Sequence, residues 1–150
     1  MITRSESETE ALARELAAEL GPDDVVYLIG DLGAGKTTFA RGLAAGLGAV
    51  AREVASPTFA ILHEYAGPAG AIVLRHLDLY WLADRPGELA ILGLPDAVAG
   101  APLAVEWPGD AIQEVLPPTV RVSIAPEKED ARRISIHRAS PESATSPKDV

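Results

Sequence analysis

The sequence predicts an α/β domain with three layers, in which helices pack on a mixed central sheet. Three observations favour this fold class. An apolar run at Val25–Ile29 precedes a glycine-rich turn and a helical pattern, as expected of a buried parallel strand and the start of its crossover. A further apolar strand is expected at 102–107. Alternating apolar and polar residues at 120–124 and 133–137 indicate an exposed antiparallel hairpin near the C-terminal end.

The length and composition of the chain fit one folded domain. Its 150 residues, of which 47% are hydrophobic and 23% charged, suffice to bury a core. Without cysteine, the chain has no disulfide, cysteine zinc site or thiol nucleophile. A net charge of −9 disfavours autonomous binding of tRNA or DNA. The domain is expected to span residues 1–138, and residues 139–150, rich in Ser, Pro and Ala, are expected to form a disordered tail.

The N-terminal segment predicts an amphipathic helix. Ser7 and Glu10 match a capping box, with Ser7 as the N-cap, and leucines recur at four-residue spacing after it. Gly21 and Pro22 are expected to end this helix. The first ten residues lack the apolar region of a secretory signal, and the sequence has no run of about 18 apolar residues that would span a membrane. We therefore expect a cytoplasmic protein.

Further elements are expected between the glycine-rich turn and the C-terminal hairpin. A helix follows the turn at 36–47 and ends at Gly48. Two strands at 59–65 and 71–77 flank a connection rich in glycine and proline, which indicates a second hairpin. Residues 84–99 read as two short helical pieces interrupted by glycine and proline.

The turn after the first apolar strand carries a complete phosphate-binding motif. Residues Gly30–Thr37 read G-x-x-x-x-G-K-[ST], in which glycines allow successive backbone N–H groups to point at phosphate oxygens. The N-terminus of the following helix adds the positive end of its dipole. Lys36, the only lysine before Lys128, is expected to reach the β- and γ-phosphates, and the Thr37 hydroxyl to bind Mg²⁺. The motif in this context predicts a P-loop NTPase-like fold.

A loop of this kind needs a second acidic residue near the magnesium, commonly at the end of a neighbouring strand. Asp78 ends the apolar segment 72–78 and is the best candidate. The alternative is that Asp78 only caps the next turn. His76, in the same segment, is expected to be structural, because phosphoryl transfer needs no histidine.

Four segments together resemble the bacterial TsaE family, also called YjeE. They are Gly30–Phe39, Ser56–Phe59 (SPTF), His76–Tyr80 (HLDLY) and Val105–Pro108 (VEWP). The resemblance covers about residues 5–137. The loop is shared with many NTPases, whereas the second and fourth segments are more specific. The family comprises small ATPases needed for the threonylcarbamoyladenosine modification of tRNA.

The resemblance implies roles for individual residues. Asp78 would be the Walker B-like acid, Thr58 would lie in a switch-like loop near the γ-phosphate and Mg²⁺, and Glu106 would position or polarise the attacking water. Trp107 is expected near the nucleotide, with a core position as the equal alternative, and Thr58 on its own pattern indicates only a turn. The expected catalytic residues are Lys36, Glu106 and Thr58, and the expected metal-binding residues are Thr37, Asp78, Thr58 and Glu106. The expected ATP-binding residues are Gly30, Asp31, Leu32, Gly33, Ala34, Gly35, Lys36, Thr37, Thr38 and Trp107.

One position departs from the family pattern. The family usually has an arginine after the Asp-x-Tyr segment, where this chain has Trp81. Arg85, four residues later, is the candidate replacement. The departure puts in doubt any role of that arginine in phosphate sensing or partner contact.

Three functions are compatible with these residues. The resemblance implies an ATPase, weak in isolation, that uses ATP and Mg²⁺ to reset or remodel a complex of TsaD and TsaB, the proteins that transfer the threonylcarbamoyl group to tRNA. The tRNA would then be contacted only indirectly. A small-molecule kinase is less favoured, because no Arg-rich lid follows Asp78, and a non-enzymatic, nucleotide-gated binding module stays open. No Asn-Lys-x-Asp segment occurs, which disfavours a GTPase.

Overall fold

A computed structural model of the chain describes residues 1–50, 53–55, 62–80, 93–94 and 96–139. The strands are β1 (Ile2–Thr3), β2 (Val25–Ile29), β3 (Glu53–Ala55), β4 (Leu62–Ala66), β5 (Ile72–Asp78), β6 (Leu103–Glu106), β7 (Val120–Pro126) and β8 (Arg132–Arg138). The helices are α1 (Glu6–Ala17), α2 (Lys36–Gly46) and α4 (Ala111–Val115), with short 3₁₀ turns η1 (Asp96–Val98) and η2 (Lys128–Asp130).

The strands within these residues form one mixed sheet in the order β1-β8-β7-β2-β6-β5-β4-β3. The four central strands β7, β2, β6 and β5 are parallel to one another. Antiparallel strands extend the sheet on both sides, β8 and β1 next to β7 and β4 and β3 next to β5. The sheet is therefore mixed and the domain is α/β, as the sequence predicts, and parallel strands in the centre bring their C-terminal ends to one edge.

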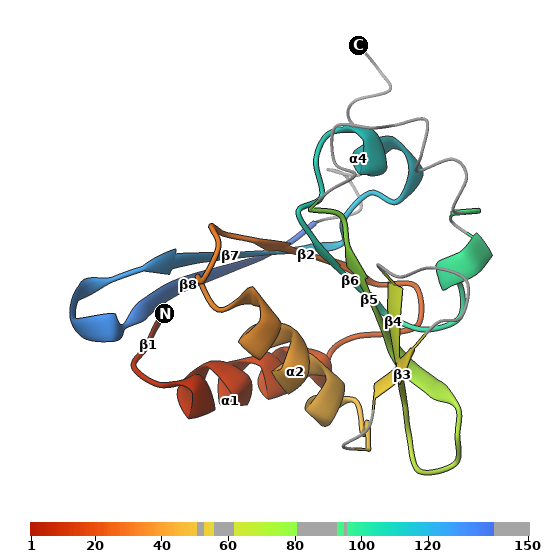
Figure 1. Cartoon of the computed structure of the whole chain (residues 1–150), viewed down its shortest axis with the longest axis horizontal. Helices are drawn as coiled ribbons and strands as arrows, with labels where there is room; N and C mark the ends of the chain where they lie inside the picture. The colour runs from red at the N-terminus through yellow and green to blue at the C-terminus, as the bar shows by residue number, and fades with distance from the viewer. Residues whose placement is uncertain (51–52, 56–61, 81–92, 95, 140–150) are drawn as a thin grey trace.

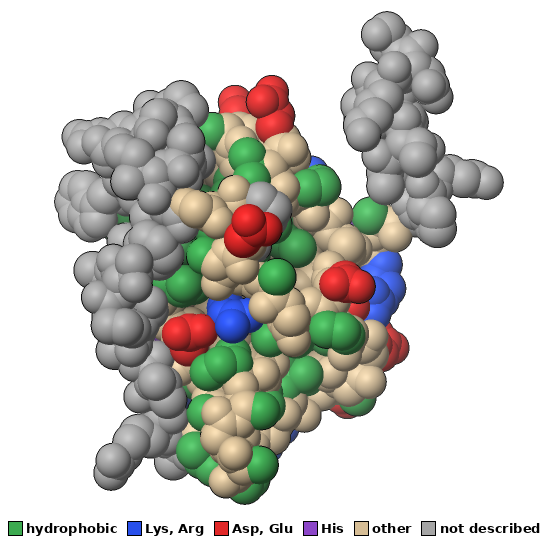
Figure 2. Space-filling model, turned by 90° about the vertical axis from the view of Figure 1, so that its right-hand side faces the viewer, with side chains coloured by type: hydrophobic (Ala, Val, Ile, Leu, Met, Phe, Trp, Pro, Cys, Tyr) green, Lys and Arg blue, Asp and Glu red, His purple; other side chains and the backbone are tan. Residues whose placement is uncertain are grey.

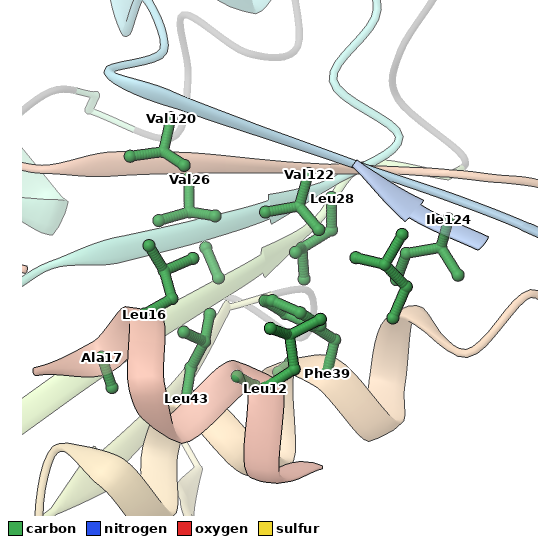
Figure 3. Close-up of a cluster of buried hydrophobic side chains, with 14 of the residues drawn as sticks. Leu12, Leu16, Ala17, Val26, Leu28, Phe39, Leu43, Val120, Val122 and Ile124 are labelled. Carbon is green, nitrogen blue, oxygen red and sulfur yellow. The ribbon is translucent and has the colours of Figure 1, made fainter. Parts of the chain in front are cut away.

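Apolar side chains pack on both faces of the sheet. On one face, α1 and α2 lie side by side and cover β2 and β7 (Figure 1), and Figure 3 shows Leu12 and Phe39 from these helices facing Val26 and Leu28 of β2. On the opposite face, Tyr27 of β2 packs in a second cluster that includes residues of β6 and α4. Because successive residues of a strand point to opposite faces, the wholly apolar run of β2 serves both clusters.

The helices α1 and α2 pack unusually closely because glycines of α2 face alanines of α1. A Cβ atom added at Gly42 would lie 2.7 Å from the Cβ of Ala13, and one added at Gly46 would lie 2.7 Å from the Cβ of Ala17. Both distances are far below van der Waals contact, so the present separation of the helices requires glycine at these positions. This pair fixes α2, and with it the loop that precedes α2, against the rest of the domain.

The first helix begins two residues earlier than the sequence predicts. Ser5 is the N-cap, and its hydroxyl accepts a hydrogen bond from the backbone N–H of Glu8 at 3.1 Å. The carboxylate of Glu8 in turn accepts a hydrogen bond from the backbone N–H of Arg4. The segment contains two overlapping S-x-x-E patterns, and the prediction that Ser7 is the cap is wrong because the first pattern is the one used.

The C-terminal hairpin is less exposed than the sequence predicts. β7 and β8 pair antiparallel as expected, but β7 also pairs in parallel with β2 and is an interior strand. Val120 and Val122 are completely buried, whereas Arg121 and Ser123, which alternate with them, are exposed. The alternation thus reflects one covered face of an interior strand.

Several expectations fall partly outside the described residues. The second predicted hairpin corresponds to β4 and β5, although residues 59–61 of its first strand are not described. Of the helical pieces expected at 84–99, only η1 lies in the described part, and the tail from 140 to 150 lies outside it.

The sequence patterns do not predict β1, β3 or α4. No helix in the described part is long and apolar enough to cross a membrane.

Candidate nucleotide-binding site

The loop between β2 and α2 has the conformation that its glycines permit. Gly33 and Gly35 have φ angles of 79° and 112°, in the region that other residues rarely adopt. Gly30 is required for a different reason, because a Cβ atom there would lie 2.5 Å from the backbone oxygen of Ile124 in β7. Helix α2 begins at Lys36, directly after the loop, so the positive end of its dipole lies at the loop.

Lys36 is held inside the site by the loop and by an aromatic ring. Its side chain is buried, its Nζ donates a hydrogen bond to the backbone oxygen of Gly30 at 2.5 Å, and Nζ lies 3.4 Å from the centre of the Trp107 ring. Burial lowers the pKa of the Lys36 ammonium, and the nearby carboxylates of Glu106, Asp78 and Asp31 act in the opposite direction. An ammonium over an indole face is a favourable cation–π contact.

Two carboxylates meet at the C-terminal ends of adjacent parallel strands. Asp78 of β5 and Glu106 of β6 are partners in the strand register. Glu106 is 5% exposed, and its Oε2 lies 2.7 Å from Nε2 of His76, which is equally buried. Asp78 accepts a hydrogen bond from the backbone N–H of Tyr80 at 3.0 Å, so it caps the turn after β5 and also faces the cavity described below.

Trp107 belongs to the site and not to either apolar core cluster. Its φ angle of 55° is rare for a bulky residue, and it directly follows the buried Glu106. One side of the indole contacts the ammonium of Lys36, and the Tyr80 ring packs edge-on at 5.0 Å between ring centres. An unusual backbone angle held by two specific contacts is typical of a functional position.

A cavity of about 390 Å³ lies in front of the loop. It brings together most of the residues that the sequence singles out. Those that line it are Leu32, Gly33, Gly35, Lys36, Thr37, Thr38, Asp78, Glu106 and Trp107. Gly30 and Asp31 line a smaller cavity of about 190 Å³ that Trp107 also lines, and Ala34 lines neither cavity. Thr58, Trp81 and Arg85 lie outside the described residues.

The cavity is completed by residues that sequence reasoning missed. Ser5, Glu6 and Thr9 come from the start of α1, and Asp130 and Arg132 come from the turn into β8. These segments reach the loop only because β8 and β7 continue the sheet beyond β2, a pairing between residues about a hundred positions apart that no local pattern reveals. The only local signal was the unusual density of charge in the turn before β8.

The donor set at this site fits a magnesium nucleotide. In the described part of the chain, no group of three or more His, Asp or Glu side chains is placed to hold a metal ion by itself. Mg²⁺ is usually bound through one or two carboxylates together with phosphate oxygens and water. Asp78, Glu106 and the Thr37 hydroxyl line the same cavity as the loop, so a bound triphosphate would supply the remaining ligands.

The parallel strands, the glycine loop before α2 and the acid at the neighbouring strand end define the P-loop class of α/β proteins. A family model described as threonylcarbamoyl adenosine biosynthesis protein TsaE matches residues 3–134. The chain therefore belongs to the TsaE family, which takes part in the biosynthesis of threonylcarbamoyladenosine in tRNA. The prediction from the four sequence segments is confirmed.

Individual relatives support this assignment. The protein named tRNA threonylcarbamoyladenosine biosynthesis protein TsaE from Rickettsia felis is 37% identical over 145 residues, which is 96% of this chain and 82% of the relative. The protein of the same name from Bacillus subtilis is 42% identical over 135 residues, covering 89% and 81% of the two chains. The crystal structure of YdiB from Bacillus subtilis superposes with a TM-score of 0.71 at 32% identity, covering 99% of this chain and 90% of that one.

Proposed function

We propose that this chain is an ATPase that binds ATP with Mg²⁺ and uses its hydrolysis to reset or remodel a complex of TsaD and TsaB during tRNA modification. The observation that carries the proposal is the common cavity of the glycine loop, Lys36 and the carboxylate pair Asp78 and Glu106. Phosphoryl transfer depends mainly on positioning and charge stabilisation, and these residues are of the types that P-loop enzymes use for it.

Binding of the phosphates would change the partner of Lys36. In the structure its ammonium contacts the Gly30 carbonyl and the Trp107 ring. Phosphate oxygens are stronger acceptors than a carbonyl and carry full charge, so the ammonium would turn to the β- and γ-phosphates while backbone N–H groups of the loop hold the remaining oxygens. Mg²⁺, held by Thr37 and Asp78, would neutralise charge that develops on the phosphate oxygens.

In this proposal, Glu106 acts on the attacking water. Its Oε2 is paired with His76, which leaves Oε1 to accept a hydrogen bond from a water molecule near the γ-phosphate. The water oxygen forms a bond to the γ-phosphorus as the bond to the bridging oxygen breaks, ADP leaves, and the water's proton passes to the carboxylate or to phosphate. The two carboxylates would thus have distinct roles: Asp78 would hold Mg²⁺, and Glu106 would act on the attacking water.

The surface charge agrees with an indirect role toward RNA. The net charge is −9, and the described residues on the face drawn in Figure 2 show isolated acidic and basic side chains without a continuous basic patch. A protein that bound tRNA strongly on its own would be expected to carry such a patch. We therefore assign RNA binding to the partner complex and expect the chain to work in the cytoplasm, where tRNA is modified.

Nucleotide binding is tested by titration calorimetry with ATP and Mg²⁺. Lys36→Ala is expected to weaken ATP binding about a hundredfold, because it removes charge-assisted contacts to two phosphates. Lys128→Ala removes an exposed lysine outside the site and serves as the matched control. Equal affinity of Lys36→Ala and the unaltered chain would contradict the assignment of the loop.

Hydrolysis is tested by measuring phosphate release with and without TsaD and TsaB. We expect slow release by the chain alone, faster release with the partners, and a decrease of about a hundredfold in Glu106→Gln with ATP binding retained. No release under either condition, with partners of proven activity, would refute the ATPase. If Glu106→Gln still supported tRNA modification at the normal rate, hydrolysis would be incidental and the chain would be a nucleotide-gated binding module.

A further inference from the structure

Arg132, the first residue of β8, contacts the phosphate-binding loop directly. Its Nε donates a hydrogen bond to the backbone oxygen of Ala34 at 2.9 Å, and Nη2 donates one to the backbone oxygen of Gly33 at 3.3 Å. Ninety-eight positions separate Arg132 from Ala34 in the sequence, so only the fold brings them together. The side chain is partly buried and lines the same cavity as Lys36.

The third nitrogen of the guanidinium fixes the side chain to its own turn. Nη1 donates to the backbone oxygens of Ala131 at 3.2 Å and of Asp130 at 3.4 Å. Glu129 and Asp130 in this turn have φ angles of 58° and 62°, so the turn has an unusual and specific backbone conformation. Every nitrogen of the guanidinium thus bonds to a backbone carbonyl, and the planar fork connects two backbone segments.

These bonds fix the orientation of two peptide units in the loop. The C=O and N–H of a trans peptide point in opposite directions, so holding the carbonyls of Gly33 and Ala34 toward Arg132 sets the directions of the N–H groups of Ala34 and Gly35. Glycine at 33 and 35 allows the loop conformation but does not select it, because glycine adopts many backbone angles. One bond inside the loop, from the N–H of Ala34 to the carbonyl of Asp31 at 3.0 Å, restricts these angles, and the bonds from Arg132 add a restraint from outside the loop.

We infer that Arg132 is a positioning residue for phosphate binding: it holds the loop in the conformation that receives a nucleotide before the nucleotide arrives. The inference rests on the proposed nucleotide binding and adds a residue outside the motif to it. Preorganisation raises affinity because the ordering cost is met in the free protein. A guanidinium, which stays charged at all relevant pH values, also adds positive potential to the site.

The neighbouring arginine provides a matched control. Arg133 also carries a guanidinium and lies one position further along β8, but it is exposed, pairs with the half-buried Glu127 at 2.7 Å and has no contact with the loop among those found in the described residues. Arg133→Ala therefore removes the same charge from the same strand without removing the bonds to Gly33 and Ala34. Arg132→Lys keeps the charge but cannot bridge two carbonyls with a planar fork.

The first experiment is hydrogen exchange without nucleotide, which tests the contact independently of ATP binding. In Arg132→Ala, backbone amides of Gly30–Thr37 are expected to exchange about tenfold faster, whereas amides of β2 and α2 beyond the loop keep their protection. Arg133→Ala is expected to leave the loop unchanged. Unchanged exchange in the loop of a folded Arg132→Ala would overturn the inference, whatever the protein binds.

The second experiment compares ATP with adenosine by calorimetry. Arg132→Ala is expected to raise the Kd for ATP about tenfold and Arg132→Lys by less, while adenosine, which has no phosphate, binds each variant equally. Loss of adenosine binding in the same proportion would indicate general damage and overturn the inference. Normal ATP binding by Arg132→Lys or Arg132→Ala would also overturn it. If the unaltered chain bound no ATP, the proposed function would be refuted, whereas the exchange result would stand on its own.

Discussion

Nε2 of His76 lies 2.7 Å from Oε2 of Glu106, and both side chains are only 7% exposed. The two residues come from adjacent parallel strands, β5 and β6. An ionised carboxylate can only accept hydrogen bonds, so Nε2 of the histidine carries the hydrogen and donates it. The histidine therefore contacts one oxygen of Glu106, a residue that also lines the cavity. The sequence predicts a structural role for His76, and in the structure its partner Glu106 lines the candidate site.

Replacing His76 should affect turnover more than binding. We expect His76→Ala to lower kcat for ATP hydrolysis about tenfold with little change in ATP affinity, because Glu106 loses its partner and its fixed orientation while the loop is untouched. His76→Gln, which keeps an N–H donor, should recover part of the loss. His137→Ala, at an exposed position of β8, is the control. A folded His76→Ala with normal kcat would show that Glu106 needs no support.

Local patterns predicted the parts of the fold that local physics determines. The bounds of β2 agree with the apolar run, because a strand covered on both faces excludes polar residues. The start of α2 at Lys36 agrees with the loop motif. The interior position of β7 was not predictable, because the neighbours of a strand depend on long-range pairing that its own alternation does not encode.

The site was predictable to the extent that it lies in contiguous motifs. The glycine loop follows β2, Asp78 and Glu106 are the last residues of β5 and β6, and the fold brings them to one cavity. The contribution of Arg132 could not be predicted, because it acts through bonds to backbone carbonyls, which leave no pattern of residue types in the loop. The apolar character of Trp107 was equally compatible with a position in the core. In the structure its ring instead contacts the ammonium of Lys36.

Overlapping capping boxes provide a test of the N-terminal helix. Ser5→Ala should lower the free energy of unfolding by about 1 kcal/mol, because the N–H of Glu8 loses its acceptor. Ser7→Ala, inside the helix, should have little effect. A contact between β1 and α1 supports this start of the helix, because the buried hydroxyls of Thr3 and Thr9 lie 2.7 Å apart. Chemical denaturation of both variants distinguishes the two caps, and a larger loss in Ser7→Ala would contradict the observed start of the helix.

The close contact between α1 and α2 provides a second stability test. Gly42→Ala places a methyl group 2.7 Å from both Ala13 Cβ and the backbone oxygen of Glu10, so the helices must separate. We expect a loss of about 1–3 kcal/mol in the free energy of unfolding, despite the higher helix propensity of alanine. Gly21→Ala, whose added Cβ would meet nothing closer than 3.9 Å, is the control. Equal free energies of unfolding of the two variants in urea would show that the two helices can separate without loss of stability.

Tyr27 should make the stability of the domain depend on pH in the alkaline range. Its ring is fully buried and its hydroxyl donates to the backbone oxygen of Leu116 at 2.6 Å. Burial raises the pKa of the phenol well above its ordinary value of 10.0, while the charge of Arg121 opposes the shift more weakly. Above that ordinary pKa the unfolded chain releases the proton and the folded chain keeps it, so the contribution of Tyr27 is complete below it and is lost as pH rises further.

The measurement compares the free energy of unfolding of the unaltered chain and of Tyr27→Phe at about pH 9 and about pH 11. At the lower pH, Tyr27→Phe should be less stable by about 1 kcal/mol, because the Leu116 carbonyl loses its donor. At the higher pH the difference should shrink or reverse, since phenylalanine has no proton to release in the unfolded state. The other tyrosines are present in both proteins and cancel in the comparison. A difference that stays constant between the two pH values would mean that the Tyr27 hydroxyl titrates alike in the folded and unfolded chains.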